Sequence, residues 1–335
     1  MAQAVFVADG GGSKTDLALL GLDGSLLARS RQPAFPPYEV GAAGTAERLD
    51  QALDKMQAEI ISATMPGAGL PDEVVTVEMA ALCFAGLDWE YEKQEFTDAV
   101  RGYPWARHGL IVDTDTFPLL RAGTDEATAV AVICGTGMNC VGRAASGATA
   151  WFAAIGEVSG DWGGGRQLGT EAIWHAARAA DGRGPATILQ ELTPKALGVK
   201  SMDEVTLGYH TGSLDEDAIP ELSPVVFQAA QAGDQVALSV VDRQAEEVVA
   251  YAMAALRRLG VTGQPCPIVL GGGVLAARPE PLVKAIEAKL AMREPLAYSV
   301  IVTDPPVLGA ALMAFDALGA SPAVLDEVRR SLSGA

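Results

Sequence analysis

The chain has 335 residues, 49% hydrophobic and 20% charged, which is typical of a globular protein with enough apolar residues for two domains. Its formal net charge of -18 argues against nucleic acid or an anionic membrane as a partner, because both would repel an acidic surface. The acidity does not exclude a nucleotide, whose charge is neutralised locally by a loop and Mg²⁺. No apolar stretch is long enough to span a membrane, and we expect a soluble cytoplasmic protein.

The positions of the cysteines and histidines favour neither disulfide bonds nor a zinc site. The cysteines are scattered without a C-x-x-C pair, and three of them lie in apolar runs, which predicts buried free thiols. The histidines are equally dispersed, so neither a zinc site nor a histidine-based catalytic triad is expected. These residues are Cys83, Cys134, Cys140, Cys266, His108, His175 and His210.

A glycine-rich segment lies between the first two predicted strands. The apolar residues 4–8 form one strand, residues 17–20 a second, and a third begins at Leu26 after the turn Asp23-Gly24. The intervening residues therefore form a tight hairpin turn that offers backbone N–H groups, hydroxyls and an ammonium to an anion. They are Gly10, Gly11, Gly12, Ser13, Lys14 and Thr15, with the carboxylate of Asp9 at their edge. The alternative is an ordinary glycine-rich turn.

Two other phosphate-binding motifs do not fit this segment. A P-loop requires glycine directly before the lysine and a helix after it, whereas Ser13 precedes Lys14 and a strand follows. A dinucleotide fingerprint requires glycine or alanine at Thr15 and also opens a helix. The segment is therefore either a hairpin that cradles phosphate, which we favour, or an ordinary glycine-rich turn.

Strands and helices alternate through the rest of the first half. Residues 47–65 have helical apolar spacing, residues 80–86 form a buried strand, and residues 94–100 form a short helix. Residues 110–112 form another strand, which ends at Asp113-Thr114-Asp115. The predicted sheet therefore combines an antiparallel hairpin with parallel βαβ units. Asp115 is either a catalytic carboxylate at a strand end or the N-cap of a helix, because Asp115 and Thr116 precede the apolar residues 117–120.

The same pattern then starts again. The apolar residues 129–133 lead into Gly135, Thr136 and Gly137, and residues 140–142 form the returning strand. Two such hairpins predict a duplicated fold with one phosphate loop in each half, unless the likeness is coincidence. Asn139 is either a donor to a bound ligand or a turn residue.

The second half continues with helices and two strands. A helical region over residues 216–260 breaks near Pro220 and Pro224 and ends at Gly260. Strands over 267–270 and 300–302 flank a helix over 279–292, and helices over 307–318 and from Ser321 close the chain. The strand over 267–270 ends in Gly271, Gly272 and Gly273.

Residues 156–165 contain too many glycines for a core segment. Such a stretch is either a flexible turn or a loop with demanding backbone geometry that faces a ligand. We favour the ligand-facing loop, with Gly156, Glu157, Gly160 and Asp161 as its candidate contacts. Trp162 and Tyr38 are candidates for stacking on a sugar face, with simple packing as the alternative.

The order of these motifs resembles the sugar-kinase/Hsp70/actin superfamily, and within it the BadF/BadG/BcrA/BcrD ATPase family and its N-acetylglucosamine kinase-like branch. The resemblance covers residues 4–318. It implies an α/β fold of two RNase H-like (actin-like ATPase) domains with mixed sheets flanked by helices, and an ATP cleft between them. It also implies transfer of the γ-phosphoryl group of ATP to an amino sugar or hexose such as N-acetylglucosamine or glucosamine.

The resemblance also implies roles for particular residues. Asp9 would hold Mg²⁺, and the hairpins at residues 10–15 and 135–137 would contact the phosphates of ATP. Asp115 would be the general base and a sugar contact, and Asp113 would be secondary. Residues 271–273 would contact the adenosine, and Asp161 would bind sugar hydroxyls together with Gly156, Glu157, Gly160 and Asn139.

The resemblance predicts domains over residues 1–117 and 118–335, with the helix over 307–318 returning to the first domain. It also predicts a homodimer.

The sequence departs from the kinase branch at two places that concern the substrate. Trp162 replaces a glutamate of the kinase-branch motif G-D-E-G-S, and residues 33–39 lack the sugar-binding asparagine of that branch. Alternatives are an ATPase activator of a radical dehydratase or reductase and a non-catalytic actin-like nucleotide switch. The activator's G-G-Q-D-x-K segment is absent, because the equivalent residues read Val112-Asp113-Thr114-Asp115-Thr116.

Overall fold

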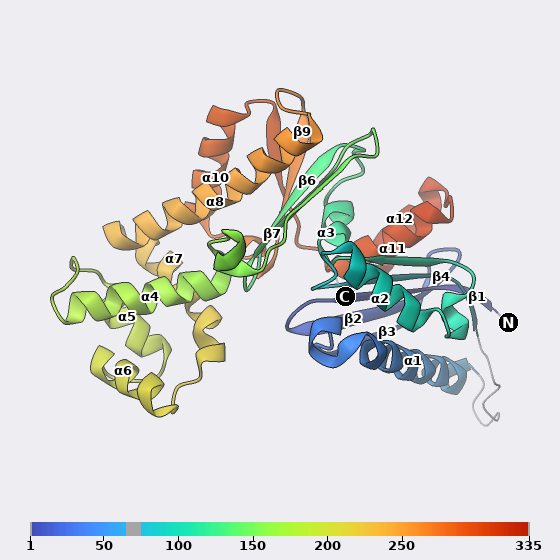
Figure 1. Cartoon of the computed structure of the whole chain (residues 1–335), viewed down its shortest axis with the longest axis horizontal. Coiled ribbons are helices and arrows are strands. Elements are labelled where there is room, and N and C mark those ends of the chain that lie inside the picture. The colour runs from blue at the N-terminus through green and yellow to red at the C-terminus, as the bar shows by residue number, and fades with distance from the viewer. Residues whose placement is uncertain (1, 65–74, 334–335) are drawn as a thin grey trace. The chain divides into compact units, whose positions relative to one another are not determined.

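The computed structural model describes residues 2–64 and 75–333 (Figure 1). Its backbone contacts divide the chain into two compact units. The N-terminal unit comprises the chain up to Asp125 together with the segment from Thr303 onward, and the central unit comprises Glu126–Val302. The boundary predicted after residue 117 lies within helix α3 (Thr116–Gly123), which belongs to the N-terminal unit.

The N-terminal unit contains a mixed sheet with helices on both faces. Its strands are β1 (Ala2–Gly10), β2 (Lys14–Gly21), β3 (Leu26–Pro33), β4 (Val75–Phe84) and β5 (Leu110–Asp113). Its helices are α1 (Pro37–Thr64), α2 (Glu90–Val100), the 3₁₀ turn η1 (Pro104–Ala106), α3, α11 (Pro306–Ala317) and α12 (Pro322–Leu332). Among the described residues the strand order is β3-β2-β1-β4-β5, with β1, β2 and β3 antiparallel and β1, β4 and β5 parallel.

Residues 4–8 of strand β1 are all apolar and buried, since both faces of the strand are covered there. Ala4 and Phe6 pack in the cluster that contains α1 and α2, whereas Val5 and Val7 pack against α11. Side chains alternate between the faces of a strand, so a strand buried on both faces has no polar alternation. In Figure 1, α1 lies on one side of this sheet and α11 and α12 lie on the other.

Helix α1 begins earlier than residue 47, where the sequence predicted its start. It starts at Pro37, and Gly41 interrupts it with φ 77° and ψ 156°. The sequence analysis did not predict this first segment because Gly41 and Gly44 interrupt the apolar periodicity and glycine is a poor helix former. The predicted helix end at residue 65 lies outside the described residues.

The central unit repeats the sheet of the N-terminal unit. Its strands are β6 (Ala129–Cys134), β7 (Met138–Arg143), β8 (Thr149–Trp151), β9 (Cys266–Gly271) and β10 (Ala297–Ile301). Over the described residues their order is β10-β9-β6-β7-β8, with β6, β7 and β8 antiparallel and β6, β9 and β10 parallel. Each strand has its counterpart in the first sheet, so the predicted duplication of the fold is confirmed.

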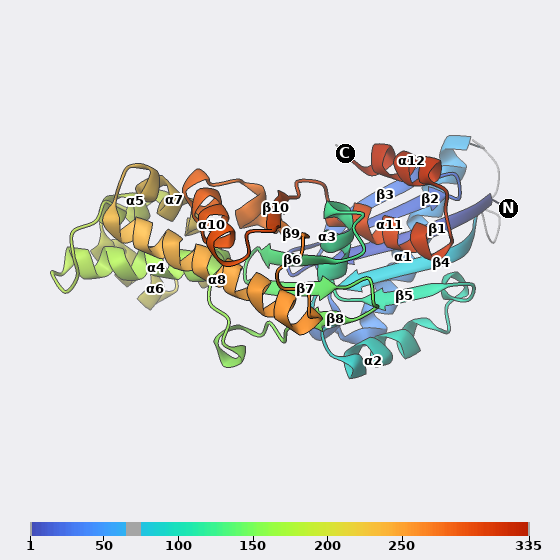
Figure 2. The same cartoon turned by 90° about the horizontal axis from the view of Figure 1, so that it is seen from above.

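Helices cover one face of this second sheet. They are α4 (Gly164–Ala180), α5 (Leu189–Ala196), α6 (Met202–Thr211), α7 (Ser223–Gln231), α8 (Gln235–Leu259), α9 (Gly273–Ala276) and α10 (Glu280–Arg293), with 3₁₀ turns η2 (Gly156–Ser159) and η3 (Glu216–Leu222). Figure 2 shows α8 beside α4 and α7. Gly260 ends α8 in the left-handed conformation with φ 70°, as predicted.

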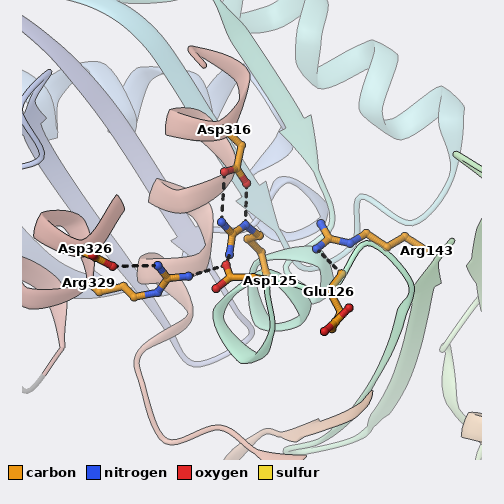
Figure 3. A network of polar contacts seen from close by, with 7 residues as sticks. Asp125, Glu126, Arg143, Asp316, Asp326 and Arg329 are labelled. Carbon is orange, nitrogen blue, oxygen red and sulfur yellow. Dashed lines mark hydrogen bonds and ion pairs between the residues drawn. The ribbon is translucent and has the colours of Figure 1, made fainter. Parts of the chain in front are cut away.

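The terminal helices are held to α3 by buried and exposed ion pairs. The guanidinium of Arg121 on α3 donates to both oxygens of Asp316 on α11, at 2.6 and 3.1 Å, and to Asp125 at 2.5 Å. Arg329 on α12 donates to the same Asp125 at 2.6 Å (Figure 3). Apolar residues of α11 and α12, among them Phe315 and Val328, are buried in the cluster that covers β1.

No helix in the described part of the chain is long and apolar enough to cross a membrane. The four cysteines are free and buried, and burial raises the pKa of each thiol.

Candidate active site

Asp9 lies at the end of β1, where the first glycine hairpin begins. It is 7% exposed, and its Oδ1 is buried without a hydrogen-bond partner. Burial raises the pKa of Asp9 well above its ordinary value, and the nearby carboxylates of Asp115 and Asp16 raise it further. A buried carboxylate oxygen without a donor lacks the solvation that it has in water, so this position favours a cation or a donor from a ligand.

The hairpin closes tightly after Asp9. The N–H of Gly11 donates to the carbonyl of Lys14 at 3.0 Å, and Gly10 lies opposite Thr15 in the register. Gly10 must be glycine because a Cβ there would lie 2.2 Å from Cδ1 of Phe84. A Cβ at Gly11 would lie 4.0 Å from Oδ2 of Asp115. The structure therefore places the predicted first phosphate loop beside the predicted base.

Lys14 binds a neighbouring acid within the hairpin. Its Nζ is 3.2 Å from Oδ2 of Asp16. Arg31 donates to both oxygens of the same carboxylate, to Oδ1 at 2.6 Å and to Oδ2 at 3.1 Å. Burial by itself would raise the pKa of Asp16, but the bonds from Arg31 and Lys14 more than offset it and the pKa is lowered. The Lys14 side chain is 46% exposed and remains accessible to a phosphate. Ser13 is exposed, whereas Thr15 is buried and its Oγ1 has no hydrogen-bond partner.

Asp115 occupies the N-cap position of α3 but does not cap the helix. Its side chain makes no capping hydrogen bond, and its φ and ψ of -64° and -6° are already helical. Although the residue is partly exposed, the surrounding protein desolvates its carboxylate. Burial raises the pKa of Asp115 to about 7, and the nearby charge of Asp88 also raises it. Of the two readings of Asp115, the structure favours a carboxylate available for chemistry.

The competing carboxylate, Asp113, is engaged elsewhere. It forms an ion pair with Lys93 of α2, and its Oδ1 accepts the N–H of Thr114 at 2.9 Å. Asp88 is a further acid near the site that the sequence analysis did not select. Like Asp115, it follows closely after the end of a strand, and that position could have identified it. The hydroxyl of Thr114 donates to Oδ1 of Asp88 at 3.1 Å and lies 3.4 Å from Oδ1 of Asp115.

The residues around Asp9 fit a magnesium ion that is held partly by nucleotide phosphates. No group of three or more His, Cys, Asp or Glu side chains in residues 2–64 and 75–333 is arranged to hold a metal alone. Mg²⁺ commonly takes only one or two carboxylates and completes its shell with water and phosphate oxygens. The Oδ1 atom of Asp9, which has no hydrogen-bond partner, could be a carboxylate ligand in such a shell.

The second glycine hairpin is held by the first turn of α4. Gly135 N donates to the carbonyl of Gly137 at 3.0 Å, and the N–H groups of Gly165 and Arg166 donate to the carbonyls of Gly135 and Thr136, at 2.7 and 3.0 Å. These helix N–H groups are therefore used within the protein. A Cβ at Gly164 would lie 2.6 Å from the Gly137 backbone, so the chain needs glycine there for this close approach.

The Gly271–Gly273 loop lies against the same hairpin. Gly272 has φ +85°, and a Cβ on it would lie 2.6 Å from the carbonyl carbon of Cys134. A Cβ on Gly273 would meet nothing within 4 Å. The structure thus brings together the predicted second phosphate loop and the predicted adenosine loop at the ends of the paired strands β6 and β9. Asn139 lies on β7 beside this hairpin, and its Oδ1 accepts the N–H of Cys140 at 2.7 Å.

Asp161 fixes the shape of its own loop. Its Oδ2 accepts from Ser159 Oγ at 2.5 Å and from the N–H of Gly156 at 3.1 Å, and its Oδ1 accepts from the hydroxyl of Tyr251 on α8. Two of these donors come from the loop itself, where Gly156 and Gly160 have φ of +82° and +85°. Glu157 is exposed in the 3₁₀ turn η2.

Of the two aromatic candidates for sugar stacking, only Tyr38 has an exposed ring. Trp162 is 8% exposed, and the guanidinium carbon of Arg243 lies 4.0 Å from its ring centroid. Its role is packing, the alternative named above. Tyr38 is 58% exposed, and a Cβ on Gly12 would lie 3.4 Å from its hydroxyl. Tyr38 therefore stands beside the first hairpin, on the helix segment that sequence reasoning treated as a loop.

Comparison with known proteins identifies the family. The model of the BadF/BadG/BcrA/BcrD ATPase family matches residues 8–314. The chain belongs to this family. The resemblance deduced from the motifs is thereby confirmed, and the match runs from the end of β1 through most of α11.

Two curated relatives are sugar kinases. N-acetyl-D-glucosamine kinase of Dictyostelium discoideum is 27% identical over 324 residues, which cover 94% of this chain and 99% of that protein. N-acetylmuramic acid/N-acetylglucosamine kinase of Clostridium acetobutylicum is 28% identical over 269 residues, which cover 80% of this chain and 84% of that protein.

Solved structures confirm the fold class. A structure from Chromobacterium violaceum matches with a TM-score of 0.68 at 21% identity and covers 93% of this family member and 99% of its own chain. A glucokinase of the ROK family from Streptomyces griseus, solved with glucose and AMPPNP, matches with a TM-score of 0.53 at 18% identity and the same coverage. The predicted α/β fold with two mixed sheets flanked by helices is confirmed.

Proposed function

We propose that this protein is an ATP-dependent sugar kinase that transfers the γ-phosphoryl group to a hydroxyl of N-acetylglucosamine or glucosamine. Asp115 carries the proposal, because it is a carboxylate at a helix start that does not cap its helix and stands beside the glycine hairpin. The two curated relatives, whose names specify N-acetylglucosamine kinases, support the same reaction.

The chemistry assigned to Asp115 follows from its surroundings. A general base must accept a proton from the sugar hydroxyl near neutral pH, and a pKa of about 7 suits that task far better than an ordinary aspartate. Phosphoryl transfer otherwise depends mainly on positioning and on neutralising the phosphate charge. Asp115 would hold the acceptor hydroxyl and take its proton as the phosphoryl group is transferred.

The glycine hairpins and Asp9 would hold ATP and its metal. Residues 10–15 would contact the β- and γ-phosphates, with Lys14 as the cation, and Asp9 would hold Mg²⁺. Mg²⁺, when bound, would neutralise phosphate charge. Residues 135–137 would form the second phosphate contact, and residues 271–273 would lie against the adenosine.

The sugar contacts follow from the loops that remain. Asp161 would accept a sugar hydroxyl with the lone pair that its three protein donors leave on Oδ1. Gly156, Glu157, Gly160 and Asn139 are further proposed contacts. Since Trp162 is buried where the kinase branch has a glutamate, we expect the sugar preference to differ in detail from that branch.

A coupled ADP-release assay with Mg²⁺-ATP tests the function. The acceptor panel contains N-acetylglucosamine, glucosamine, N-acetylmuramic acid and glucose, with a reaction lacking sugar as the blank. We expect ADP release to depend on an amino sugar and a phosphorylated sugar to accumulate in equal amount. ADP release that no sugar stimulates would contradict the proposal.

Formation of a homodimer is a separate prediction. Sedimentation of the purified protein would test it.

A further inference from the structure

The loop after β4 carries a carboxylate that the proposed reaction does not yet use. Asp88 follows Gly86 and Leu87 and is half-buried. Its backbone N–H and that of Trp89 both donate to Oε2 of Glu92, at 3.0 and 2.9 Å. This arrangement caps α2 and fixes the backbone from which the Asp88 carboxylate projects.

One hydroxyl stands between Asp88 and Asp115. Thr114 is 3% exposed, and its Oγ1 donates to Oδ1 of Asp88 at 3.1 Å. The same Oγ1 also reaches Oδ1 of Asp115, in a longer hydrogen bond of 3.4 Å. A hydroxyl has a single proton, so a bond to one carboxylate leaves the other without that donor.

The segment between β5 and α3, which contains Thr114, also contacts α2 through an ion pair. Lys93 on α2 forms an ion pair with Asp113, the residue before Thr114. The ammonium of Lys93 therefore fixes the residue that precedes Thr114. The start of α2 and the start of α3 are therefore joined twice, through Lys93–Asp113 and through Thr114–Asp88.

We propose that Asp88 is a positioning residue for Asp115: by accepting the Thr114 hydroxyl, it keeps that donor off the Asp115 carboxylate, whose lone pairs stay available for the sugar hydroxyl. This inference rests on the proposed kinase function. A base that already accepts a strong hydrogen bond is a weaker base, because its proton-accepting lone pair is stabilised. Burial and then the Asp88 charge raise the pKa of Asp115, whereas the hydrogen bond from Thr114 lowers it, so a firmer bond from Thr114 would make Asp115 a weaker base.

The test is a set of substitutions in the full-length enzyme, assayed with Mg²⁺-ATP and the best sugar of the panel. Asp88→Ala lets the Thr114 hydroxyl turn to Asp115, so we expect kcat to fall about tenfold, the equivalent of one such hydrogen bond. The KM for ATP should stay within about twofold, since the phosphate hairpins are untouched. Asp88→Asn retains an acceptor for Thr114 and should keep kcat within about threefold of the wild type.

The decisive variant is Thr114→Val combined with Asp88→Ala. Valine cannot donate to Asp115, so the double variant should have a kcat several times higher than Asp88→Ala alone. A merely structural role for Asp88 predicts the reverse, because a second buried change adds to the damage. The matched control is Glu90→Ala, which removes an exposed acid from the first turn of the same helix and should leave kcat unchanged.

The outcomes separate the inference from the function on which it rests. A wild-type protein that phosphorylates no sugar overturns the proposed function. An active wild type in which the double variant is no better than Asp88→Ala, or in which Asp88→Ala has full activity, overturns the role of Asp88. If Asp88→Ala does not fold, Asp88→Asn alone and combined with Thr114→Val is measured instead. In that case, a fall in kcat that is explained entirely by a smaller folded fraction of Asp88→Asn contradicts the proposal.

Discussion

Asp9 and Asp16 face each other across the first hairpin, in the antiparallel register that joins β1 to β2. Lys14 and Arg31 both bind Asp16, whereas Oδ1 of Asp9 is buried without a hydrogen-bond partner. The same hairpin therefore holds one acid whose pKa is lowered and one whose pKa is raised. Asp16 is a structural residue of the sheet, and Asp9 is the acid that suits a ligand.

Asp9→Asn should stabilise the protein in the absence of ligand. The pKa of Asp9 is higher in the folded than in the unfolded state, so its ionisation costs stability as pH rises above the unfolded value of about 4. Replacing the carboxylate should add about 1 kcal/mol at neutral pH, or roughly 2–4 °C in Tm. The stabilisation by Mg²⁺-ATP should disappear. Scanning calorimetry with and without Mg²⁺-ATP measures both effects.

Asp16→Asn is the matched control for that experiment. It removes a carboxylate whose lowered pKa stabilises the fold above about pH 4 and whose partners are Lys14 and Arg31. We expect a lower Tm and a retained response to Mg²⁺-ATP. A fall in Tm for Asp9→Asn, or an intact Mg²⁺-ATP response, would contradict the assignment of Asp9.

Asp115→Asn should abolish phosphoryl transfer while ATP still binds. A general base contributes about 10²–10⁴-fold to the rate, and the isosteric amide cannot accept the proton. Calorimetric titration with ATP provides the binding measurement, and the coupled assay provides the rate. Asp113→Asn, which removes the partner of Lys93, should cost much less activity. Near-normal turnover of Asp115→Asn would eliminate this residue as the base.

The pH profile reports the same carboxylate. Its pKa is raised to about 7, so the protonated, inactive form persists to nearly neutral pH. The value of kcat/KM, which reports the free enzyme, should rise with pH and level off above about 7. An unperturbed aspartate would level off above about pH 4, because its ordinary pKa is near 3.9. A flat profile between about pH 5 and 8 is incompatible with the raised pKa.

Gly272 and Gly273 should respond differently to alanine. Gly272→Ala introduces a Cβ at a φ of +85° and 2.6 Å from a backbone carbon, which should cost about 2 kcal/mol of stability or more. Gly273→Ala meets nothing within 4 Å and should leave stability unchanged. If this loop contacts the nucleoside, Gly273→Ala nevertheless weakens ATP binding. Unfolding midpoints and ATP titrations of both variants decide the matter, and unaltered ATP affinity in Gly273→Ala argues against an adenosine loop.

Arg121→Met should destabilise the N-terminal unit. The Arg121 side chain is 5% exposed and is the shared partner of Asp316 and Asp125. Its loss leaves Asp316 without its cation, whereas Asp125 keeps Arg329. Breaking a fully buried pair costs about 3–5 kcal/mol, but Asp316 and Asp125 are 42% and 69% exposed, so solvent screening reduces the expected cost to about 1–2 kcal/mol. Arg329→Met, whose partner Asp125 is 69% exposed, should cost less than about 1 kcal/mol. Equal losses in denaturant unfolding would show that the buried guanidinium is not the anchor.

Much of the local structure was predictable from the sequence, because it depends on neighbouring residues. The apolar run in β1 predicted a strand buried on both faces, and Gly260 predicted the end of α8. The glycine hairpins predicted the start of each half and hence the duplicated fold. In each case a short run of side chains sets the backbone geometry, and the order of the motifs along the chain then identified the family.

The tertiary structure alone decided which distant residues meet. The bond from Thr114 to Asp88, the packing of Arg243 over Trp162 and the bond from Tyr251 to Asp161 join residues from separate elements. Such contacts leave no periodic pattern in the sequence, because they depend on how strands and helices pack and not on the local backbone. The sequence by itself determined the kinds of elements and the motifs that carry the chemistry. Packing decided which carboxylates acquire partners, and therefore which one has a pKa suited to catalysis.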